Sequence, residues 1–135
     1  MTSTIVYKGN LRTELTHLQS GTVIENDAPT DNNGKGERFS PTDLLATSLG
    51  SCIITTMAIK AADMNLNFSE TKIEITKIMS KDTPRRIIEI GVNLIFTEFF
   101  EATDQQKTQL EHIARNCPVE KSLHPSIKLV IKFNW

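Results

Sequence analysis

The chain contains two cysteines, Cys52 and Cys117, separated by 65 positions in the sequence. Two cysteines are too few for a disulfide scaffold, and a chain of 135 residues can build a core without one. If the two thiols meet, they form a redox couple, in which one attacks an oxidant and the other closes a disulfide on the resulting sulfenic acid. Their spacing alone does not show that they meet.

Cys52 lies within a predicted helix, among small residues at positions 48–52. Gly50 inside a helix costs roughly 1 kcal/mol relative to alanine, and the close approach of another helix, another subunit or a substrate would offset that cost. Cysteine is also among the most buried residue types. Taken alone, Cys52 is therefore more simply explained as a small core hydrophobe.

Cys117 directly precedes Pro118, which is a typical first residue of a helix. A thiol at a helix N-terminus feels the positive end of the helix dipole, which lowers its pKa. The other interpretation is a buried thiol that ends the preceding helix. Both remain open, and the first predicts that Cys117 is the more acidic thiol.

A metal site is the rival use of these side chains. His112, Cys117 and His124 lie near one another in the sequence, and Cys52 could be a fourth ligand. Their spacings match no common zinc pattern. We expect His112 to face solvent and His17 to lie on a strand. Phosphate-loop and dinucleotide motifs are also missing, so we expect neither a metal nor a cofactor.

The first part of the chain is predicted to form a β-meander over residues 3–26, followed by a polar loop over residues 26–36. A long helix then begins, with Ser40 as its N-cap and Pro41 as its first residue. Asp43 stands where a carboxylate can reach back to free backbone N–H groups. The run Leu44–Met64 is apolar or small on most sides, which predicts a central helix buried nearly all round.

The second part of the chain is predicted to form a hairpin of residues 70–80 and 86–97, in which Ile88, Ile90, Val92, Leu94 and Phe96 share one face. A helix over residues 103–116, a short helix over residues 118–123 and a strand over residues 127–133 follow. Strands, helix, strands, helices and strand in this order indicate an α+β fold.

Composition excludes several classes of protein. Hydrophobic residues make up 39% and charged residues 23%, and the net charge of −1 gives no long-range field for nucleic acid. The longest uncharged stretch, residues 44–59, is shorter than the roughly 20 residues of a membrane span. The N-terminus has no signal-peptide layout. We therefore expect a cytoplasmic protein with reduced thiols that binds neither nucleic acid nor membrane.

Two motifs carry a family resemblance. The segment 40–52, Ser-Pro-Thr-Asp-Leu-Leu-Ala-Thr-Ser-Leu-Gly-Ser-Cys, together with Cys-Pro-Val-Glu at 117–120, resembles the OsmC/Ohr family of osmotically inducible and organic hydroperoxide resistance proteins. The opening Tyr-Lys-Gly at residues 7–9 also fits, and the resemblance covers residues 1–135 as one domain. It implies antiparallel sheets around a long central helix, in an intertwined homodimer with active sites at the subunit interface.

The resemblance implies a thiol-dependent peroxidase that uses neither metal nor haem. Cys52 would attack an organic hydroperoxide, Cys117 would resolve the product as a disulfide, and a dithiol such as a lipoyl group would reduce that disulfide. First attack by Cys52 differs from the helix-dipole argument, which favours Cys117. In the family an arginine supports the thiolate. Arg12 is the nearest positional match and Arg38 is the alternative.

The chain departs from the hydroperoxide-resistance branch at one position. That branch has a glutamate directly after the helix-opening proline, where this chain has Thr42, and the nearest carboxylate is Asp43. One residue is a rotation of about 100° on a helix, so Asp43 is either a substrate-binding residue, together with Arg38, or only a helix cap. The chain is thus closer to divergent OsmC-like branches. The alternative function is a non-catalytic dimer that binds a small hydrophobic ligand.

Overall fold

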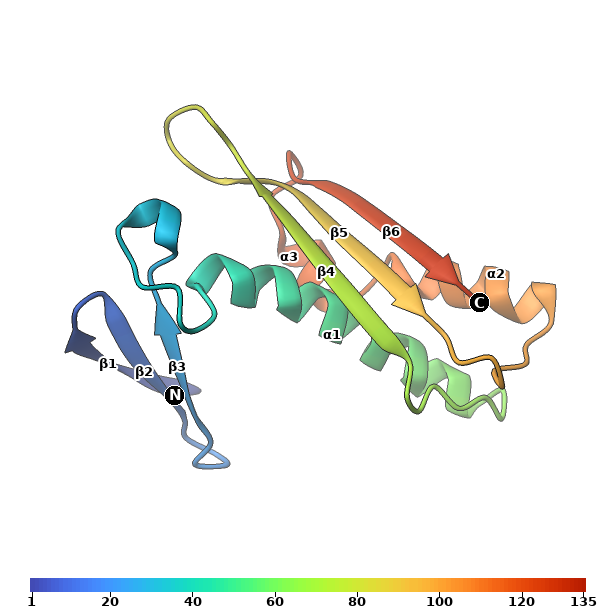
Figure 1. Cartoon of the computed structure of the whole chain (residues 1–135). Helices are drawn as coiled ribbons and strands as arrows, with labels where there is room; N and C mark the ends of the chain where they lie inside the picture. Colours follow the sequence, from blue (N-terminus) through green and yellow to red (C-terminus); the bar gives the residue numbers. More distant parts are fainter. The chain divides into compact units, whose positions relative to one another are not determined.

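The computed structural model describes residues 1–135, which divide into two compact units, Met1–Leu45 and Ala46–Trp135 (Figure 1). The first unit contains three strands and a short 3-10 helix: β1 (Ser3–Gly9), β2 (Arg12–His17), β3 (Val23–Asp27) and η1 (Thr30–Asn32). Helix α1 (Pro41–Ala62) begins in this unit and continues through the second.

The first unit is an antiparallel sheet of order β1-β2-β3, which confirms the predicted meander. Tight turns join its strands. Between β1 and β2, three successive residues have positive φ, namely Gly9 at 83°, Asn10 at 52° and Leu11 at 61°. The phenol oxygen of Tyr7 accepts a hydrogen bond from the Leu11 backbone N–H at 3.3 Å, which holds this turn closed.

The first unit buries no large apolar side chain. Its buried residues are Asn26, Asp27 and Ser40, whereas Ile5 and Tyr7 on the first strand are each 63% exposed. A β-sheet gains stability mainly by burying one apolar face. The apolar residues of this sheet are therefore left without cover within the first unit.

Helix α1 begins as predicted. The backbone N–H of Ser40 donates to the Asp43 carboxylate at 2.8 Å, and the backbone N–H of Asp43 donates to the Ser40 hydroxyl at 3.1 Å. This reciprocal pair is a capping box with aspartate in place of glutamate. Asp43 therefore has a structural role at the helix N-terminus.

The prediction that α1 is buried nearly all round is wrong for the single chain. Its buried residues recur at helical spacing along one side, as Ala46, Leu49, Gly50, Ile53, Met57 and Ala61. Leu45 is 41% exposed and Ile59 is 76% exposed. One sheet can cover only one side of a helix, so the apolar residues of the other side remain open.

By length and composition α1 is also apolar enough to cross a membrane, with a mean hydropathy of 1.5. The uncharged stretch of sixteen residues in the sequence is shorter than this helix, which has 22 residues. Its buried side forms part of a protein core with the sheet of the second unit. That packing is expected of the core helix of a globular domain, which passes the same test.

The second unit contains a sheet of order β4-β5-β6, formed by β4 (Lys72–Met79), β5 (Ile87–Ile95) and β6 (Lys128–Asn134). Strands β4 and β5 form the predicted hairpin, but β6 runs parallel to β5, so this sheet is mixed rather than wholly antiparallel. The chain reaches β6 through helices α2 (Asp104–Ala114) and α3 (Pro118–Ser122). A helical crossover of this kind returns a strand in the parallel direction.

A β-bulge changes the predicted face of β5. The register shifts between Ile78 and Met79, so Met79 pairs with Ile87 and Ile78 pairs with Glu89. As a result Ile87 is buried, whereas Ile88, which alternation placed in the core, is 38% exposed. The bulge inserts one extra residue, and alternation resumes correctly only from position 90 onward.

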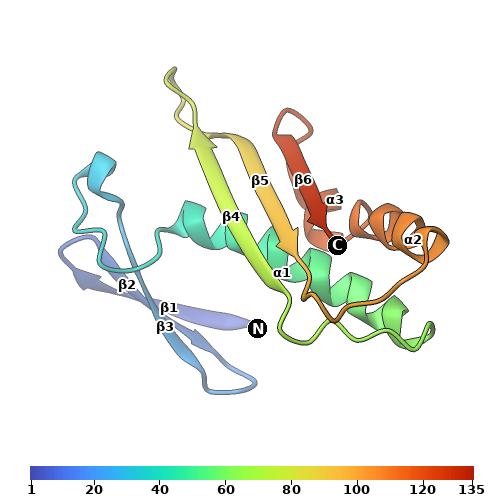
Figure 2. The same cartoon turned by 45° about the vertical axis from the view of Figure 1, so that its right-hand side comes forward.

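The core of the second unit lies between its sheet and its helices. Figures 1 and 2 show α1 and α2 on the same side of the β4-β5-β6 sheet. Ile90, Val92 and Leu94 of β5 are at most 1% exposed there, and Leu110 of α2 is fully buried. An aromatic cluster closes one end of this core, with Trp135 stacked on Phe96 at 4.2 Å between ring centroids. The Trp135 indole N–H donates to the Glu111 carboxylate at 3.0 Å.

Candidate active site

The structure brings the two cysteines together. Cys52 is half-buried on α1, Cys117 is fully buried at the start of α3, and both are free thiols. A side-chain hydrogen bond joins them. Residues 65 positions apart therefore form one dithiol, which is the condition that a two-cysteine redox couple requires.

Two helix ends position Cys117. Helix α2 ends at Ala114, and Cys117 adopts an extended backbone, with φ −74° and ψ 150°, as the N-cap of α3. Pro118 follows as the first residue of α3, where its missing N–H has no cost. The backbone N–H of Glu120 donates to the Cys117 sulfur at 3.4 Å.

The pKa of Cys117 is raised, contrary to the expectation from the helix dipole. Burial is the largest cause, because it penalises the charged thiolate. The Glu120 backbone N–H acts in the opposite direction, while the hydrogen bond to Cys52 and the Glu120 carboxylate both raise the pKa further. Helix α3 has only five residues, so its dipole is too short to outweigh desolvation.

Burial and electrostatics distinguish the two thiols. The interaction with Cys52 raises the pKa of Cys117 and so stabilises its protonated form. Cys52 is also the more accessible of the two, since Cys117 is 0% exposed. The arrangement favours Cys52 as the sulfur that meets an oxidant first.

Gly50 lies on the side of α1 that packs against the sheet of the second unit, where a larger residue would not fit. A Cβ atom at this position would lie 2.5 Å from Cδ1 of Ile75 and 3.3 Å from Cγ2 of Ile73. The close neighbour that the sequence requires at Gly50 is thus strand β4. Glycine here lets the segment of α1 that carries Cys52 approach the sheet.

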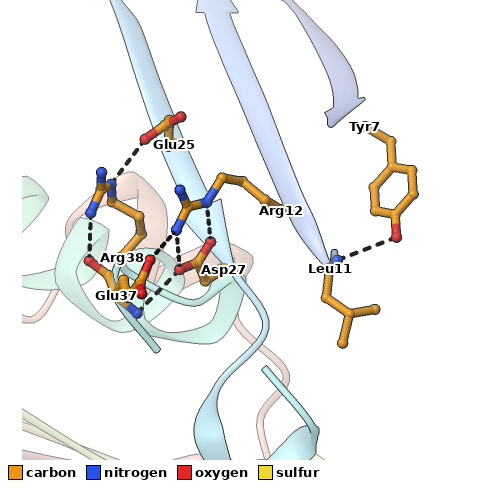
Figure 3. Close-up of polar contacts among 7 residues, drawn as sticks. All are labelled: Tyr7, Leu11, Arg12, Glu25, Asp27, Glu37 and Arg38. Atoms are coloured by element: carbon orange, nitrogen blue, oxygen red, sulfur yellow. Dashed lines mark hydrogen bonds and ion pairs between the residues drawn. The ribbon is translucent and has the colours of Figure 1, made fainter. Parts of the chain in front are cut away.

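In the first unit, Arg12 is the centre of a charged cluster (Figure 3). Its Nε donates to Oδ1 of Asp27 at 2.6 Å and its Nη2 donates to Oδ2 at 2.8 Å. The same Nη2 donates to Glu37 at 2.8 Å. Arg12 lowers the pKa of Asp27, whose side chain is only 3% exposed. The Arg12 guanidinium therefore forms ion pairs with two carboxylates.

Arg38 has partners of its own. Its Nε donates to the Glu25 carboxylate at 2.9 Å and its Nη1 donates to the backbone oxygen of Glu37 at 2.9 Å (Figure 3). Asp43 is held in the capping box of α1, and the hydroxyl of Thr42 lies 3.1 Å from that of Ser40. Arg12, Arg38 and Asp43 belong to the first unit and the cysteines to the second.

Three carboxylates of these clusters were not singled out from the sequence. Asp27 lies opposite Arg12 in the register of β2 and β3, and correct pairing of these strands across their turn would have found it. Glu37 follows a loop whose path the sequence does not specify. Glu120 stood in the Cys-Pro-Val-Glu motif, and its Oε2 is a buried oxygen without a hydrogen-bond partner.

None of the hydrogen bonds of the histidine side chains involves Cys52 or Cys117. His112 is exposed on α2, and the His124 ring nitrogen Nδ1 lies 2.7 Å from the Ser126 hydroxyl. The His17 ring is exposed on β2, and its Nδ1 lies 2.7 Å from the Ser20 hydroxyl. No group of three or more histidine, cysteine, aspartate or glutamate side chains is arranged to hold a metal ion.

Comparison with known families decides the relationship. A family model described as OsmC-like protein matches residues 34–132, which include both cysteine motifs. The chain belongs to the OsmC-like protein family. No match was found among curated proteins.

Solved structures of OsmC-like proteins share the whole fold. A protein of Psychrobacter arcticus 273-4, named as a candidate osmotic stress induced and detoxification response protein, is 46% identical with a TM-score of 0.93, over 99% of this chain and 96% of that one. An organic hydroperoxide resistance protein OsmC from Legionella pneumophila is 12% identical with a TM-score of 0.75, over 100% and 98%. The chain therefore has the α+β OsmC-like fold.

A third structure adds a bound molecule to the comparison. A candidate organic hydroperoxide resistance protein from Vibrio cholerae, with captopril bound in one of its active sites, is 14% identical with a TM-score of 0.75. The alignment covers 99% of this chain and 92% of that one. At this identity the likeness concerns the OsmC-like fold alone.

Proposed function

We propose that this OsmC-like protein is a thiol-dependent peroxidase that reduces organic hydroperoxides through Cys52 and Cys117. The observation that supports the proposal best is the hydrogen-bonded pair of reduced thiols, formed by an accessible and a buried cysteine. Family membership supports it too, since some relatives of the same fold are named organic hydroperoxide resistance proteins. A reducing cytoplasm would keep the pair ready to react.

The first step is attack of the Cys52 thiolate on the peroxide. Its sulfur bonds to the terminal oxygen of R–O–O–H, the O–O bond breaks, and the alkoxide takes a proton and leaves as the alcohol. Cys52 is then a sulfenic acid. Because Cys117 already contacts the Cys52 sulfur, the second thiol is in place before oxidation begins.

The second step is resolution. The Cys117 sulfur attacks the Cys52 sulfur, the S–O bond breaks, and hydroxide leaves with the thiol proton as water. A dithiol, such as a lipoyl group, then reduces the disulfide by exchange and is itself oxidised. Neither step requires a metal or an organic cofactor.

Arg12 is proposed to support the Cys52 thiolate, as the resemblance to the family implies. Asp27 and Glu37 hold its guanidinium in a fixed orientation, with bonds of 2.6 to 2.8 Å. They would do so in place of the glutamate that the hydroperoxide-resistance branch has at the position of Thr42. Arg38 and Asp43 remain the candidate substrate-binding residues.

A homodimer is part of the proposal. The first unit leaves Ile5, Val6 and Tyr7 each more than half exposed, and α1 exposes 76% of Ile59. Large apolar side chains that are exposed to this degree are typical of an interface. A second copy of the chain would cover them and complete an active site at the interface, as the family resemblance implies.

The proposal is tested by adding cumene hydroperoxide to the reduced protein and following free thiols and intact mass. We expect both thiols to be lost and the mass to fall by about two hydrogen atoms, as one disulfide forms. Cys52→Ser should abolish turnover, because it removes the attacking sulfur. Unchanged thiols in the native protein, or unchanged turnover in Cys52→Ser, would contradict the proposal.

A second candidate is a non-catalytic dimer that binds a small hydrophobic molecule. The charged cluster favours it, because two carboxylates already neutralise Arg12 and weaken its electrostatic support for a thiolate. A molecule retained through native purification, with thiols that ignore peroxide, would favour this candidate. If Cys52→Ser left that binding intact, the thiol would have no role in it.

A further inference from the structure

Glu120 is a half-buried acidic side chain that the proposed reaction has not yet used. Its side chain is 17% exposed, and its Oε2 is buried without a hydrogen-bond partner. Lys121, at 4.0 Å from the other carboxylate oxygen, makes only a loose ion pair. A buried carboxylate oxygen normally has a partner, because leaving it unsatisfied destabilises the folded protein.

The same residue touches the buried thiol through its backbone. Its N–H donates to the Cys117 sulfur at 3.4 Å, and the two residues are three positions apart, within one turn at the start of α3. The carboxylate also acts electrostatically on Cys117. The ionisable groups that act on this thiol are thus Cys52 from α1 and Glu120 from its own helix.

Resolution requires the Cys117 sulfur to lose its proton. Burial, the Cys52 side chain and the Glu120 carboxylate all raise the pKa of this thiol, which favours its protonated form. A thiol of this kind attacks fastest when a nearby base takes its proton as the S–S bond forms. The Glu120 carboxylate lies within one helical turn of Cys117 and has an oxygen without a hydrogen-bond partner, so it is an acceptor of the kind required.

We propose that the Glu120 carboxylate takes the proton of Cys117 during disulfide closure and passes it to the departing hydroxide. This deepens the proposed peroxidase function and rests on it for the sulfenic acid step. The balance is complete: Cys117 S–H and Cys52 S–OH give one disulfide and one water. Glu120 ends in its starting state, so no further reactant is required.

The test is Glu120→Gln, which keeps the backbone N–H bonded to Cys117 and removes only the basicity. Cumene hydroperoxide is mixed rapidly with reduced protein, and a dimedone probe measures the Cys52 sulfenic acid. We expect sulfenic acid to form at the native rate and disulfide closure to slow at least tenfold, within the usual range for a lost general base. Glu101→Gln, an exposed glutamate with the same change of charge, is the control and should close normally.

The pH profile separates a base from a merely structural side chain. The native closure rate should be nearly flat around neutral pH, whereas the Glu120→Gln rate should rise with pH as hydroxide replaces the lost base. Glu120→Asp retains a carboxylate and should recover part of the rate. An unchanged rate of disulfide closure in Glu120→Gln overturns the proposal. A faster rate overturns it too, since the carboxylate would then act only by raising the pKa of Cys117 and disfavouring its thiolate.

A second route to the disulfide tests Glu120 independently of peroxide. Dithiodipyridine converts Cys52 to a mixed disulfide and releases one thiopyridone, and attack by Cys117 then releases the second. Slow release of only the second equivalent in Glu120→Gln supports the role of Glu120 even if cumene hydroperoxide leaves the thiols intact. Native release of the second equivalent overturns it, even if the peroxidase function is confirmed.

Discussion

Cys117 lies against Cys52 at the point where the chain has left α2 and Pro118 begins α3. Its side chain is fully buried and interacts with that of Cys52, so it is shielded from an oxidant but close to its partner. We therefore expect Cys117→Ser to stop the reaction halfway. After cumene hydroperoxide, a dimedone adduct should appear on Cys52, with no intramolecular disulfide.

Intact mass and peptide mapping check this prediction, with the native protein as the reference. The native chain should show a disulfide and little adduct, because resolution competes with trapping. A disulfide between two chains of Cys117→Ser, or no adduct on Cys52, would show that Cys117 does not act as the resolving thiol.

Asp27 is the most buried carboxylate of the Arg12 cluster, at 3% exposure. Arg12 holds its pKa below the ordinary value of 3.8. A lowered folded-state pKa contributes stability above the unfolded pKa, and this contribution is lost as the pH falls through the folded value. We expect Asp27→Asn to lower the urea midpoint at pH 7 and to reduce the further loss of stability as the pH falls below about 4.

Urea titrations across this pH range, followed by circular dichroism, measure the effect. Asp31→Asn is a useful comparison because Asp31 is exposed in η1. Equal midpoints for native protein and Asp27→Asn at pH 7 would mean that the cluster does not stabilise the fold.

Gly50 lets helix α1 lie close to strand β4, where a Cβ atom would come within 2.5 Å of Ile75. We expect Gly50→Val to destabilise the protein by about 1–3 kcal/mol, since an overpacked contact forces the helix or the strand to move. Gln109→Val, exposed on α2, should cost only a few tenths of a kcal/mol in helix propensity. Thermal melting of the two variants separates packing from propensity, and equal melting temperatures would contradict the packing argument.

Local sequence signals located most of the helices and strands. The cap at Ser40 located the first residue of α1, because Ser40 and Asp43 act within four residues of the chain. Non-local pairing was harder to predict. The bulge at Ile88 and the parallel direction of β6 depend on strand register and crossover path, which no short window contains.

The same difference applies to the candidate site. The sequence identified both cysteines as candidates but did not predict their contact, because that contact depends on how α1 packs in the second unit. The carboxylate partners of Arg12 depend on the register of β2 against β3 and on a loop. Of the two interpretations left open for Cys117, the structure favours the buried thiol, since burial outweighs the local helix end and raises its pKa.

The exposed apolar side of α1 and the uncovered sheet of the first unit predict self-association of the whole chain. Sedimentation equilibrium should give twice the chain mass of 15.1 kDa. Ile59→Glu places a charge on a side chain that is 76% exposed in the single chain, and it should shift the equilibrium toward monomer. Gln105→Glu, exposed on α2, adds the same charge elsewhere and should leave the mass unchanged. A native protein that sediments as a monomer would contradict the dimer.

The aromatic residues that close the turn of the first unit and the core of the second have an optical consequence. The chain has one tyrosine, Tyr7, and one tryptophan, Trp135, and each compact unit contains one of them. Their emission therefore reports separately on the two units during unfolding. Coincident transitions would mean that residues 1–135 melt as a single cooperative domain, as we expect. A tyrosine transition that precedes the tryptophan transition would show that the sheet of the first unit melts alone.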